Sequence, residues 1–112
     1  MKYKIKSKIW IEVDGQIILG EGRVRLLKAI KETGSLTKAA KTLNMSYKKA
    51  WGLVDAVNSM AEKSVVTKSV GGKNGGGTIL TEYGEKLIKI FEEINESCWE
   101  HLDGQIKTRD LE

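Results

Sequence analysis

The sequence predicts a small α+β domain that starts with a β-hairpin and ends with a long helix. Three observations lead to this fold class. Apolar residues alternate around a two-residue turn near the start, and three helical patterns follow in close succession. Two short β-rich runs then enclose a glycine loop before a last helical pattern. The chain of 112 residues suits one domain with one modest core.

The opening hairpin is predicted from a period of two. Apolar and polar side chains alternate along residues 3–13, which is typical of a half-buried strand. Asp14 and Gly15 then supply a two-residue turn, and an apolar run to Leu19 follows it. We therefore expect a hairpin over residues 3–19.

Three short helices are expected next. The first covers residues 23–33 and ends at Gly34, a residue type that commonly ends helices. Ser35 and Ser46 are suitable N-caps for the second and third helices. Because only two residues separate these last two helices, residues 35–61 are predicted to form a helix-turn-helix.

The second half of the chain predicts a wing and a long helix. The β-rich runs around the glycines make residues 64–80 a hairpin directly after the third helix, which is the position of a wing. Thr81 can cap a helix over residues 82–102. An Asp-Gly pair is expected to break that helix and to leave residues 103–112 as a polar tail.

These elements together predict a winged helix-turn-helix domain over residues 1–102, with DNA as its ligand. A recognition helix needs polar or basic side chains on its first turns to reach base edges in the major groove. Hydroxyl and backbone N–H groups at helix starts can hold a phosphate. The candidate DNA contacts are Ser35, Thr37, Ser46, Tyr47, Lys48, Lys49, Lys73 and Asn74. Trp51 borders the core-facing side, so we expect it to pack rather than to contact DNA.

The glycine loop over residues 71–77 has two other interpretations. A nucleotide-binding loop would place Lys-Ser or Lys-Thr after its last glycine and open a helix. Here Lys73 lies inside the loop and a strand follows, which disfavours a nucleotide site. A flexible loop without a partner is the other alternative. We favour a wing whose backbone approaches the phosphodiester closely.

Charge is distributed unevenly along the chain. Residues 1–81 carry a formal charge of +9 and residues 82–112 carry −5, within a net charge of +4. A basic front and an acidic last helix favour a nucleic-acid face on one side of the molecule. The alternative is ordinary solubilising charge.

The last helix is longer than a small core requires. Its expected 20 or so residues would span about 30 Å. We therefore expect a two-fold homodimer whose contact includes an apolar stripe on this helix, although the same stripe could instead cover the core of its own chain. The stripe consists of Leu87, Phe91, Ile94, Cys98 and Leu102.

A single cysteine and a single histidine limit the chemistry. Cys98 cannot form an internal disulfide, and with His101 it cannot supply four zinc ligands. The pair lacks a third orienting group, so a buried thiol is favoured over a nucleophilic site. We expect no enzyme activity, cofactor or metal. No apolar run approaches the ~20 residues of a membrane span, and no signal peptide is recognised, so we expect a cytoplasmic location without membrane binding.

Five segments resemble the N-terminal DNA-binding domain of the ModE-type molybdate-dependent transcriptional regulators. The more specific two are Met-Ser-Tyr-Lys-Lys-Ala-Trp at 45–51 and Gly-Gly-Lys-Asn-Gly-Gly-Gly at 71–77. Segments 34–41 and 80–84 are shared with the wider LysR-like winged helices, and the fifth is 20–30. The resemblance extends over roughly residues 3–100. It implies a dimer on a two-fold operator and places the candidate contacts near DNA.

Members of this family bind molybdate or tungstate in an additional C-terminal domain, whereas this chain ends after the DNA-binding part. We therefore expect that metal-oxyanion regulation is absent or comes from a separately encoded sensor protein. The expected function is sequence-specific binding of double-stranded DNA to regulate transcription. The rival is a protein-interaction adaptor on the same fold. The lysines of the third helix and of the wing disfavour that rival, because an adaptor should present an apolar patch there.

Overall fold

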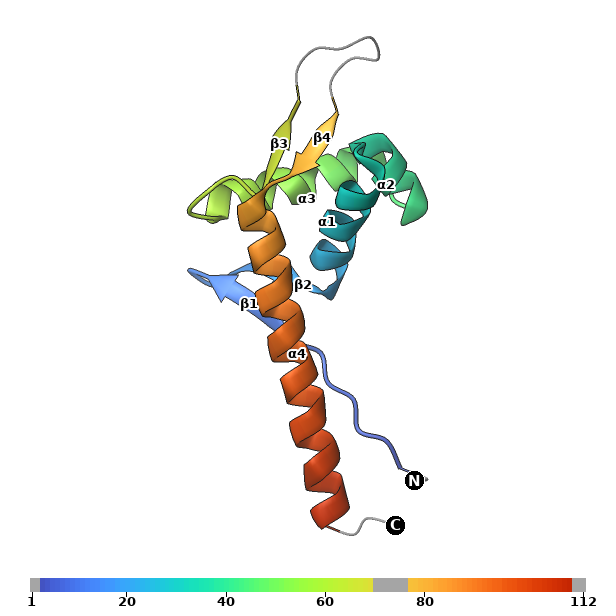
Figure 1. Cartoon of the computed structure of the whole chain (residues 1–112), viewed down its shortest axis with the longest axis vertical. Helices are drawn as coiled ribbons and strands as arrows, with labels where there is room; N and C mark the ends of the chain where they lie inside the picture. The colour runs from blue at the N-terminus through green and yellow to red at the C-terminus, as the bar shows by residue number, and fades with distance from the viewer. Residues whose placement is uncertain (1–2, 70–76, 110–112) are drawn as a thin grey trace.

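The computed structural model describes residues 3–69 and 77–109 and confirms the α+β fold, with a hairpin, three helices, two wing strands and a long last helix (Figure 1). The elements in chain order are β1 (Trp10–Val13), β2 (Gln16–Gly20), α1 (Glu21–Thr33), α2 (Leu36–Thr42), α3 (Tyr47–Met60), β3 (Val66–Lys68), β4 (Thr78–Leu80) and α4 (Glu82–Thr108).

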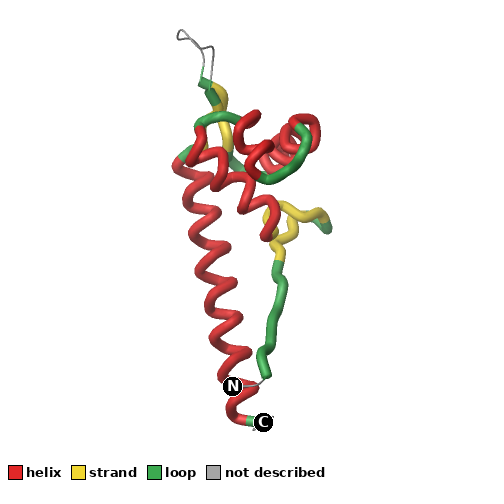
Figure 2. The backbone as a smooth tube through the Cα atoms, turned by 90° about the vertical axis from the view of Figure 1, so that its right-hand side faces the viewer, coloured by secondary structure: helices red, strands yellow, loops and turns green. Residues whose placement is uncertain are grey.

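The hydrophobic core lies around α1, which contacts α2, α3, α4, β2 and β4. Three of the most deeply buried side chains, Leu26, Leu27 and Ile30, come from this helix. Val57 of α3 and Val65 before β3 bring the helix-turn-helix and the wing onto the same core. The molecule measures 60 × 29 × 22 Å because α4 extends well beyond this body (Figures 1 and 2).

The N-terminal hairpin forms, but it is shorter than expected. Asp14 and Gly15 adopt positive φ angles of 51° and 79°, as a two-residue turn between strands requires. Residues 3–9 are not part of a strand and instead run beside the far half of α4 (Figures 1 and 2). Their alternating burial reflects one side against α4 and one side in solvent, and no strand of the described chain pairs with them.

The caps of the helix-turn-helix are those that the sequence predicts. Ser35 Oγ accepts a hydrogen bond from the Lys38 backbone N–H at 3.1 Å, and Ser46 Oγ accepts one from the Lys49 N–H at 3.1 Å. Each bond satisfies a backbone donor that has no partner inside its helix. Gly34, with a φ of 67°, ends α1 and turns the chain into α2.

The two wing strands are antiparallel and are attached to the body at both ends. Val66 pairs with Leu80, and Lys68 pairs with Thr78. The Thr78 backbone N–H donates to the Gly34 carbonyl oxygen at 3.0 Å, so β4 is joined to the turn before α2. The structural description does not include most of the predicted glycine loop.

The last helix begins at Thr81, whose Oγ1 accepts from the Gly84 backbone N–H at 3.0 Å. The buried residues of α4 are Gly84, Ile88 and Phe91, all near its start. A Cβ atom at Gly84 would lie 2.5 Å from the Val65 carbonyl oxygen, so only glycine allows this close contact between α4 and the start of the wing.

The prediction that α4 ends at residue 102 is wrong, because the helix continues to Thr108. A glycine inside a helix costs only about 0.5–1 kcal/mol relative to alanine. Extending an established helix adds one hydrogen bond per residue, which outweighs a single Gly104. Residues 103–108 of the expected tail are therefore helical. Within residues 3–69 and 77–109, no helix is both long enough and apolar enough to span a membrane.

Candidate nucleic-acid interface

The start of α3 presents a polar and basic surface. Ala50, Val54 and Val57 attach the helix to the core by one side. Tyr47, Lys48 and Lys49 lie exposed at the first turn, directly after the capping residue Ser46. The core-facing stripe thus fixes the helix, and the predicted contact residues lie on its accessible surface at the N-terminal end.

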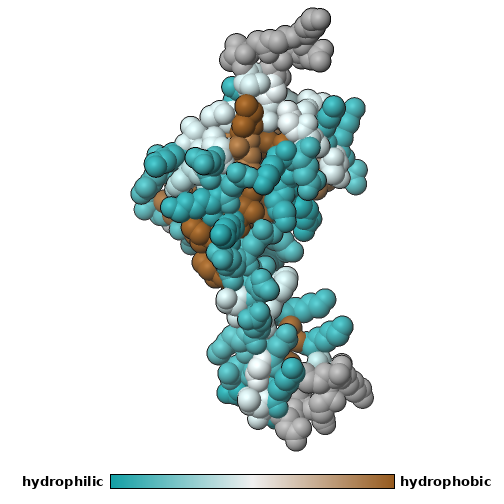
Figure 3. All heavy atoms as spheres, viewed as in Figure 1, coloured by the Kyte–Doolittle hydropathy of each residue, from teal (hydrophilic) through white to brown (hydrophobic). Residues whose placement is uncertain are grey.

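The beginning of α2 lies close by, because α2 and α3 pack against each other. Ser35 is half-buried and uses its hydroxyl as the N-cap, whereas Thr37 and Lys38 are exposed. In Figure 3 the surface over α2 is mainly hydrophilic. The structure therefore brings six of the eight predicted DNA contacts onto α2, α3 and their caps. The other two, Lys73 and Asn74, lie outside the described residues.

The lysines of α2 and α3 have no acidic partner among the residues that the structure describes. These helices carry four lysines and one acidic residue, Asp55. None of the four forms an ion pair with any carboxylate of residues 3–69 and 77–109. Their charge is therefore available to a ligand. The lysines are Lys38, Lys41, Lys48 and Lys49.

Three of the four cations of α1, Arg25, Lys28 and Lys31, form ion pairs with carboxylates of the described residues. Lys28 Nζ donates to Glu92 Oε2 of α4 at 2.8 Å, and Lys31 pairs with Glu85 of the same helix. The hydrogen bond to Glu92, together with the charge of that carboxylate, raises the pKa of Lys28. Helix α4 carries seven acidic and three basic side chains, and part of its negative charge thus neutralises lysines of α1. The lysines of α2 and α3 form no such pairs among the described residues.

Asn58 connects the third helix to the wing, and the sequence analysis did not identify it. Its Oδ1 accepts hydrogen bonds from the backbone N–H groups of Val65 at 2.8 Å and Val66 at 3.1 Å. Its Nδ2 donates to the Val66 carbonyl oxygen at 2.9 Å. A polar residue at the edge of the apolar stripe of α3 was the available signal. These three bonds fix the first residues of β3 against α3.

At the other end of the wing, Ser69 and Gly77 form hydrogen bonds with each other, and Gly77 lies close to the turn before α2. The Ser69 backbone N–H donates to the Gly77 carbonyl oxygen at 2.9 Å, and the Gly77 N–H donates to Ser69 Oγ at 2.9 Å. A Cβ at Gly77 would lie 3.0 Å from the Gly34 carbonyl oxygen. The wing therefore contacts both sides of the helix-turn-helix.

The environment of the Trp51 side chain differs from the predicted one. Core packing was expected, yet its side chain is 45% exposed and is not among the residues that pack against the core. The helical phase of residue 51 borders the core-facing stripe, and no element of the described chain covers it. Trp51 therefore belongs to the accessible surface of α3.

The predicted dimer stripe is divided by the fold. Leu87 packs against the core, and Phe91 is 3% exposed, so Phe91 is a core residue rather than a surface contact. The reason is that the first turns of α4 cover α1. Ile94, by contrast, is 50% exposed, and Cys98 and Leu102 are half-buried farther along the helix. Of the five stripe residues, Ile94 alone is exposed, and Leu87, Cys98 and Leu102 are half-buried.

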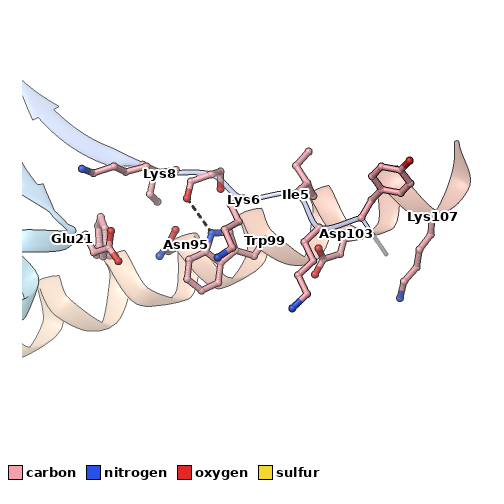
Figure 4. Close-up of a pocket in the computed structure, with 13 residues that line it drawn as sticks. Ile5, Lys6, Lys8, Glu21, Asn95, Trp99, Asp103 and Lys107 are labelled. Atoms are coloured by element: carbon pink, nitrogen blue, oxygen red, sulfur yellow. Dashed lines mark hydrogen bonds between the residues drawn. The ribbon is translucent and has the colours of Figure 1, made fainter. Parts of the chain in front are cut away.

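A cavity of about 750 Å³ lies between the N-terminal segment and the far half of α4 (Figure 4). Trp99 Nε1 donates to the Ser7 carbonyl oxygen at 3.3 Å across it, and Ser7 Oγ lies 3.6 Å from Cys98 Sγ. Asn95 Oδ1 is buried beside it without a hydrogen-bond partner among the described residues. Nowhere in that part of the chain do three His, Cys, Asp or Glu side chains gather as metal ligands.

The fold and this face define a protein of the winged-helix type with a basic helix-turn-helix. No protein-family model matches the chain. The Azotobacter vinelandii "Molybdenum transport protein ModE" is 35% identical over 97 residues, 87% of this chain and 36% of that protein. The Haemophilus influenzae "Transcriptional regulator ModE" is 40% identical over 82 residues, 73% of this chain and 32% of that protein.

A third relative is the Rhodobacter capsulatus "Molybdenum-pterin-binding protein MopB", 43% identical over 94 residues, 84% of this chain and 35% of that protein. These similarities confirm the predicted resemblance to ModE-type transcriptional regulators. They are consistent with a correspondence between this chain and the N-terminal domain of those proteins. The chain spans about a third of the length of each of these three relatives.

Proposed function

We propose that the chain is a sequence-specific DNA-binding regulator of transcription, similar to ModE, and not an enzyme. In this proposal the first turns of α3 enter the major groove. Thr37 and the lysines of α2 lie along one phosphate strand, and the wing lies along the adjacent backbone. The capping residues Ser35 and Ser46 stand at the N-termini of α2 and α3, where backbone N–H groups can hold a phosphate.

One observation carries the proposal: all four lysines of α2 and α3 lie without an ion-pair partner among the described residues, beside a single acidic residue, Asp55. Cations that pair internally, such as Lys28 with Glu92, contribute little to attraction of a polyanion. Unpaired lysines on an exposed surface can replace the counterions condensed on DNA, which favours association entropically. The excess of unpaired lysines over acidic residues on the helix-turn-helix supports a phosphate-bearing ligand over a protein partner.

We further propose that two copies associate through the far half of α4. Beyond Phe91 no described residue of α4 is buried. Two large apolar side chains there, Ile94 and Trp99, are 50% and 46% exposed. The radius of gyration of 17.1 Å exceeds the ~13 Å of a compact domain of this length. A second copy on the same stripe would cover this apolar surface and present two reading faces to two half-sites.

The names of two of the relatives concern molybdenum, and the chain covers about a third of each of these two proteins. We propose that any molybdate signal reaches this helix-turn-helix from another domain or from a separately encoded sensor protein. A stable oxyanion site needs convergent donors in a dry pocket. No polar or charged residue is buried within the described part of the chain.

Fluorescence anisotropy with labelled genomic duplexes at 50 mM and 200 mM salt tests DNA binding. We expect nanomolar to micromolar binding to some fragments. If six phosphates are contacted, affinity should fall about a thousandfold between the two salt concentrations. An absent signal on every fragment, or a signal that does not depend on salt, would favour the adaptor function instead.

A further inference from the structure

We propose that Tyr47 and Trp51 form an aromatic pair that contacts thymine methyl groups in the major groove and so determines part of the operator sequence. The inference rests on the proposed DNA binding and adds a reading position to it. It also gives Trp51 a role that the sequence analysis did not assign.

The two side chains lie on the same side of α3. They are four residues apart, so they are neighbours along one helix face. Tyr47 is 50% exposed and Trp51 is 45% exposed, and neither packs against the hydrophobic core. Neither has a hydrogen-bond partner anywhere in residues 3–69 and 77–109. Large aromatic side chains are usually well buried, so two adjacent exposed ones on one helix face form an apolar surface that a ligand can cover.

Their position on α3 favours DNA as the occupant. Tyr47 is the first residue of the helix and Trp51 lies one turn later, within the part that enters the groove in helix-turn-helix proteins. Lys48 and Lys49 lie between them in sequence and have no ion-pair partner in the described structure. A Cβ at Gly52 would have no atom within 4 Å, so the surface beside Trp51 is open to a large ligand.

The chemistry of the groove then selects the base. The C5-methyl of thymine is the apolar group on the major-groove edge of the base pairs, whereas the other positions are hydrogen-bond donors and acceptors. Covering a methyl group with an aromatic face removes apolar surface from water, which favours binding. Covering a polar base edge without a hydrogen bond instead costs desolvation free energy. The lysines can meanwhile contact phosphates or guanine O6 and N7. We therefore assign thymine to the positions that the aromatic pair contacts.

The test removes the methyl group alone. Duplexes that bind the full chain are selected from a random library, and each thymine is then replaced singly by deoxyuridine. Burial of one methyl group corresponds to a roughly fourfold effect on the dissociation constant. We expect a loss of about this size at one or two positions in each half-site, and little effect elsewhere.

The same duplexes are then titrated with Trp51→Ala and Tyr47→Ala. Each variant should bind the thymine duplex more weakly and should no longer distinguish thymine from deoxyuridine at one position. Trp10→Ala is the matched control, because Trp10 is 51% exposed but lies on β1 of the N-terminal hairpin. In this control, both the affinity for the thymine duplex and the preference for thymine over deoxyuridine should stay at the wild-type value.

The outcomes separate the inference from the proposed function. If no duplex is selected at any salt concentration, the DNA-binding function itself fails. If duplexes are selected but no thymine position responds to deoxyuridine, the function stands and the aromatic contact is overturned. The aromatic contact is also overturned if Trp51→Ala and Tyr47→Ala keep the wild-type preference. The deoxyuridine measurement uses the unmodified protein, so it decides the matter even if a variant folds poorly.

Discussion

The backbone N–H of Thr78 donates a hydrogen bond to the carbonyl oxygen of Gly34 at 3.0 Å, although 44 residues separate them. This bond joins β4 of the wing to the turn that leads into α2. On the opposite strand, Asn58 of α3 holds the backbone of Val65 and Val66. The wing is thus tied to both helices of the helix-turn-helix, and the three proposed DNA-contacting elements have a fixed relation to one another.

Asn58→Ala should weaken this connection. The backbone N–H groups of Val65 and Val66 would lose their acceptor at buried residues, so we expect the free energy of unfolding to fall by about 2 kcal/mol. Urea denaturation measures this change, and hydrogen exchange at Val65 and Val66 should accelerate. Ser59→Ala is the neighbouring control, since Ser59 Oγ donates only to Ala56 of its own helix. Equal effects of both variants would contradict the role of Asn58.

Gly84→Ala should destabilise the protein strongly. The added Cβ would lie 2.5 Å from the Val65 carbonyl oxygen and 2.6 Å from Leu80 Cδ1. Overpacking of this kind typically costs about 1–3 kcal/mol. Gly104→Ala, in the same helix but with open space around it, should instead stabilise by about 0.5–1 kcal/mol. Thermal unfolding of both variants checks the opposite signs, and a neutral Gly84→Ala would show that α4 can move away from β3.

Removal of the charges at the start of α3 should weaken DNA binding. For Lys48→Ala combined with Lys49→Ala, we expect the dissociation constant to rise roughly tenfold or more and the salt slope to fall by about 2. Lys107→Ala, near the end of the acidic α4, should change the dissociation constant less than about twofold. Anisotropy titrations measure all three proteins. Similar losses for both changes would place the DNA-binding face elsewhere.

A charge on the accessible part of the α4 stripe should disrupt the proposed dimer. Ile94→Asp would place a carboxylate in an apolar contact, where an unpaired charge is strongly unfavourable. We expect the wild type to sediment as a dimer and this variant as a monomer at micromolar concentration. Ile17→Asp is the control, because Ile17 is 42% exposed on the hairpin. A monomeric wild type well above micromolar concentration would refute the interface.

Molybdate or tungstate should not bind this chain stoichiometrically at micromolar concentration. Ordering a surface segment around an oxyanion costs roughly 1 kcal/mol per residue or more. No polar or charged residue is buried among those that the structure describes, and the buried Asn95 Oδ1 is a hydrogen-bond acceptor, which cannot bind an oxyanion. Isothermal titration calorimetry measures the binding. A stoichiometric micromolar site that also changes DNA affinity would show that an oxyanion site exists in this chain.

Features that depend on a few neighbouring residues could be predicted from the sequence. Ser35 and Ser46 cap their helices because a serine hydroxyl reaches the N–H three residues later. Gly34 and Asn44 adopt left-handed backbone angles, with φ of 67° and 54°, which their residue types favour. Turns and caps are therefore set locally, and from them the order of elements follows.

Features that depend on distant segments could not be predicted in this way. The alternation of apolar and polar residues over 3–9 predicts a strand, but it does not show whether a second strand is present to pair with it. Phe91 and Ile94 belong to one helical stripe, and only the position of α1 separates the buried residue from the exposed one. The bonds of Asn58 require β3 to return to α3. Each of these is a tertiary property.

Helix α4 carries seven acidic and three basic side chains and extends away from the helix-turn-helix along the 60 Å axis (Figure 1). The lysines of residues 3–9 run beside its far half and offset part of that negative charge. If the chain binds DNA as proposed, the phosphates would attract the lysines of α2 and α3 more strongly than the far end of α4. The electric field of the duplex would then turn the molecule during its approach, and the association rate constant, as well as the affinity, would depend on ionic strength.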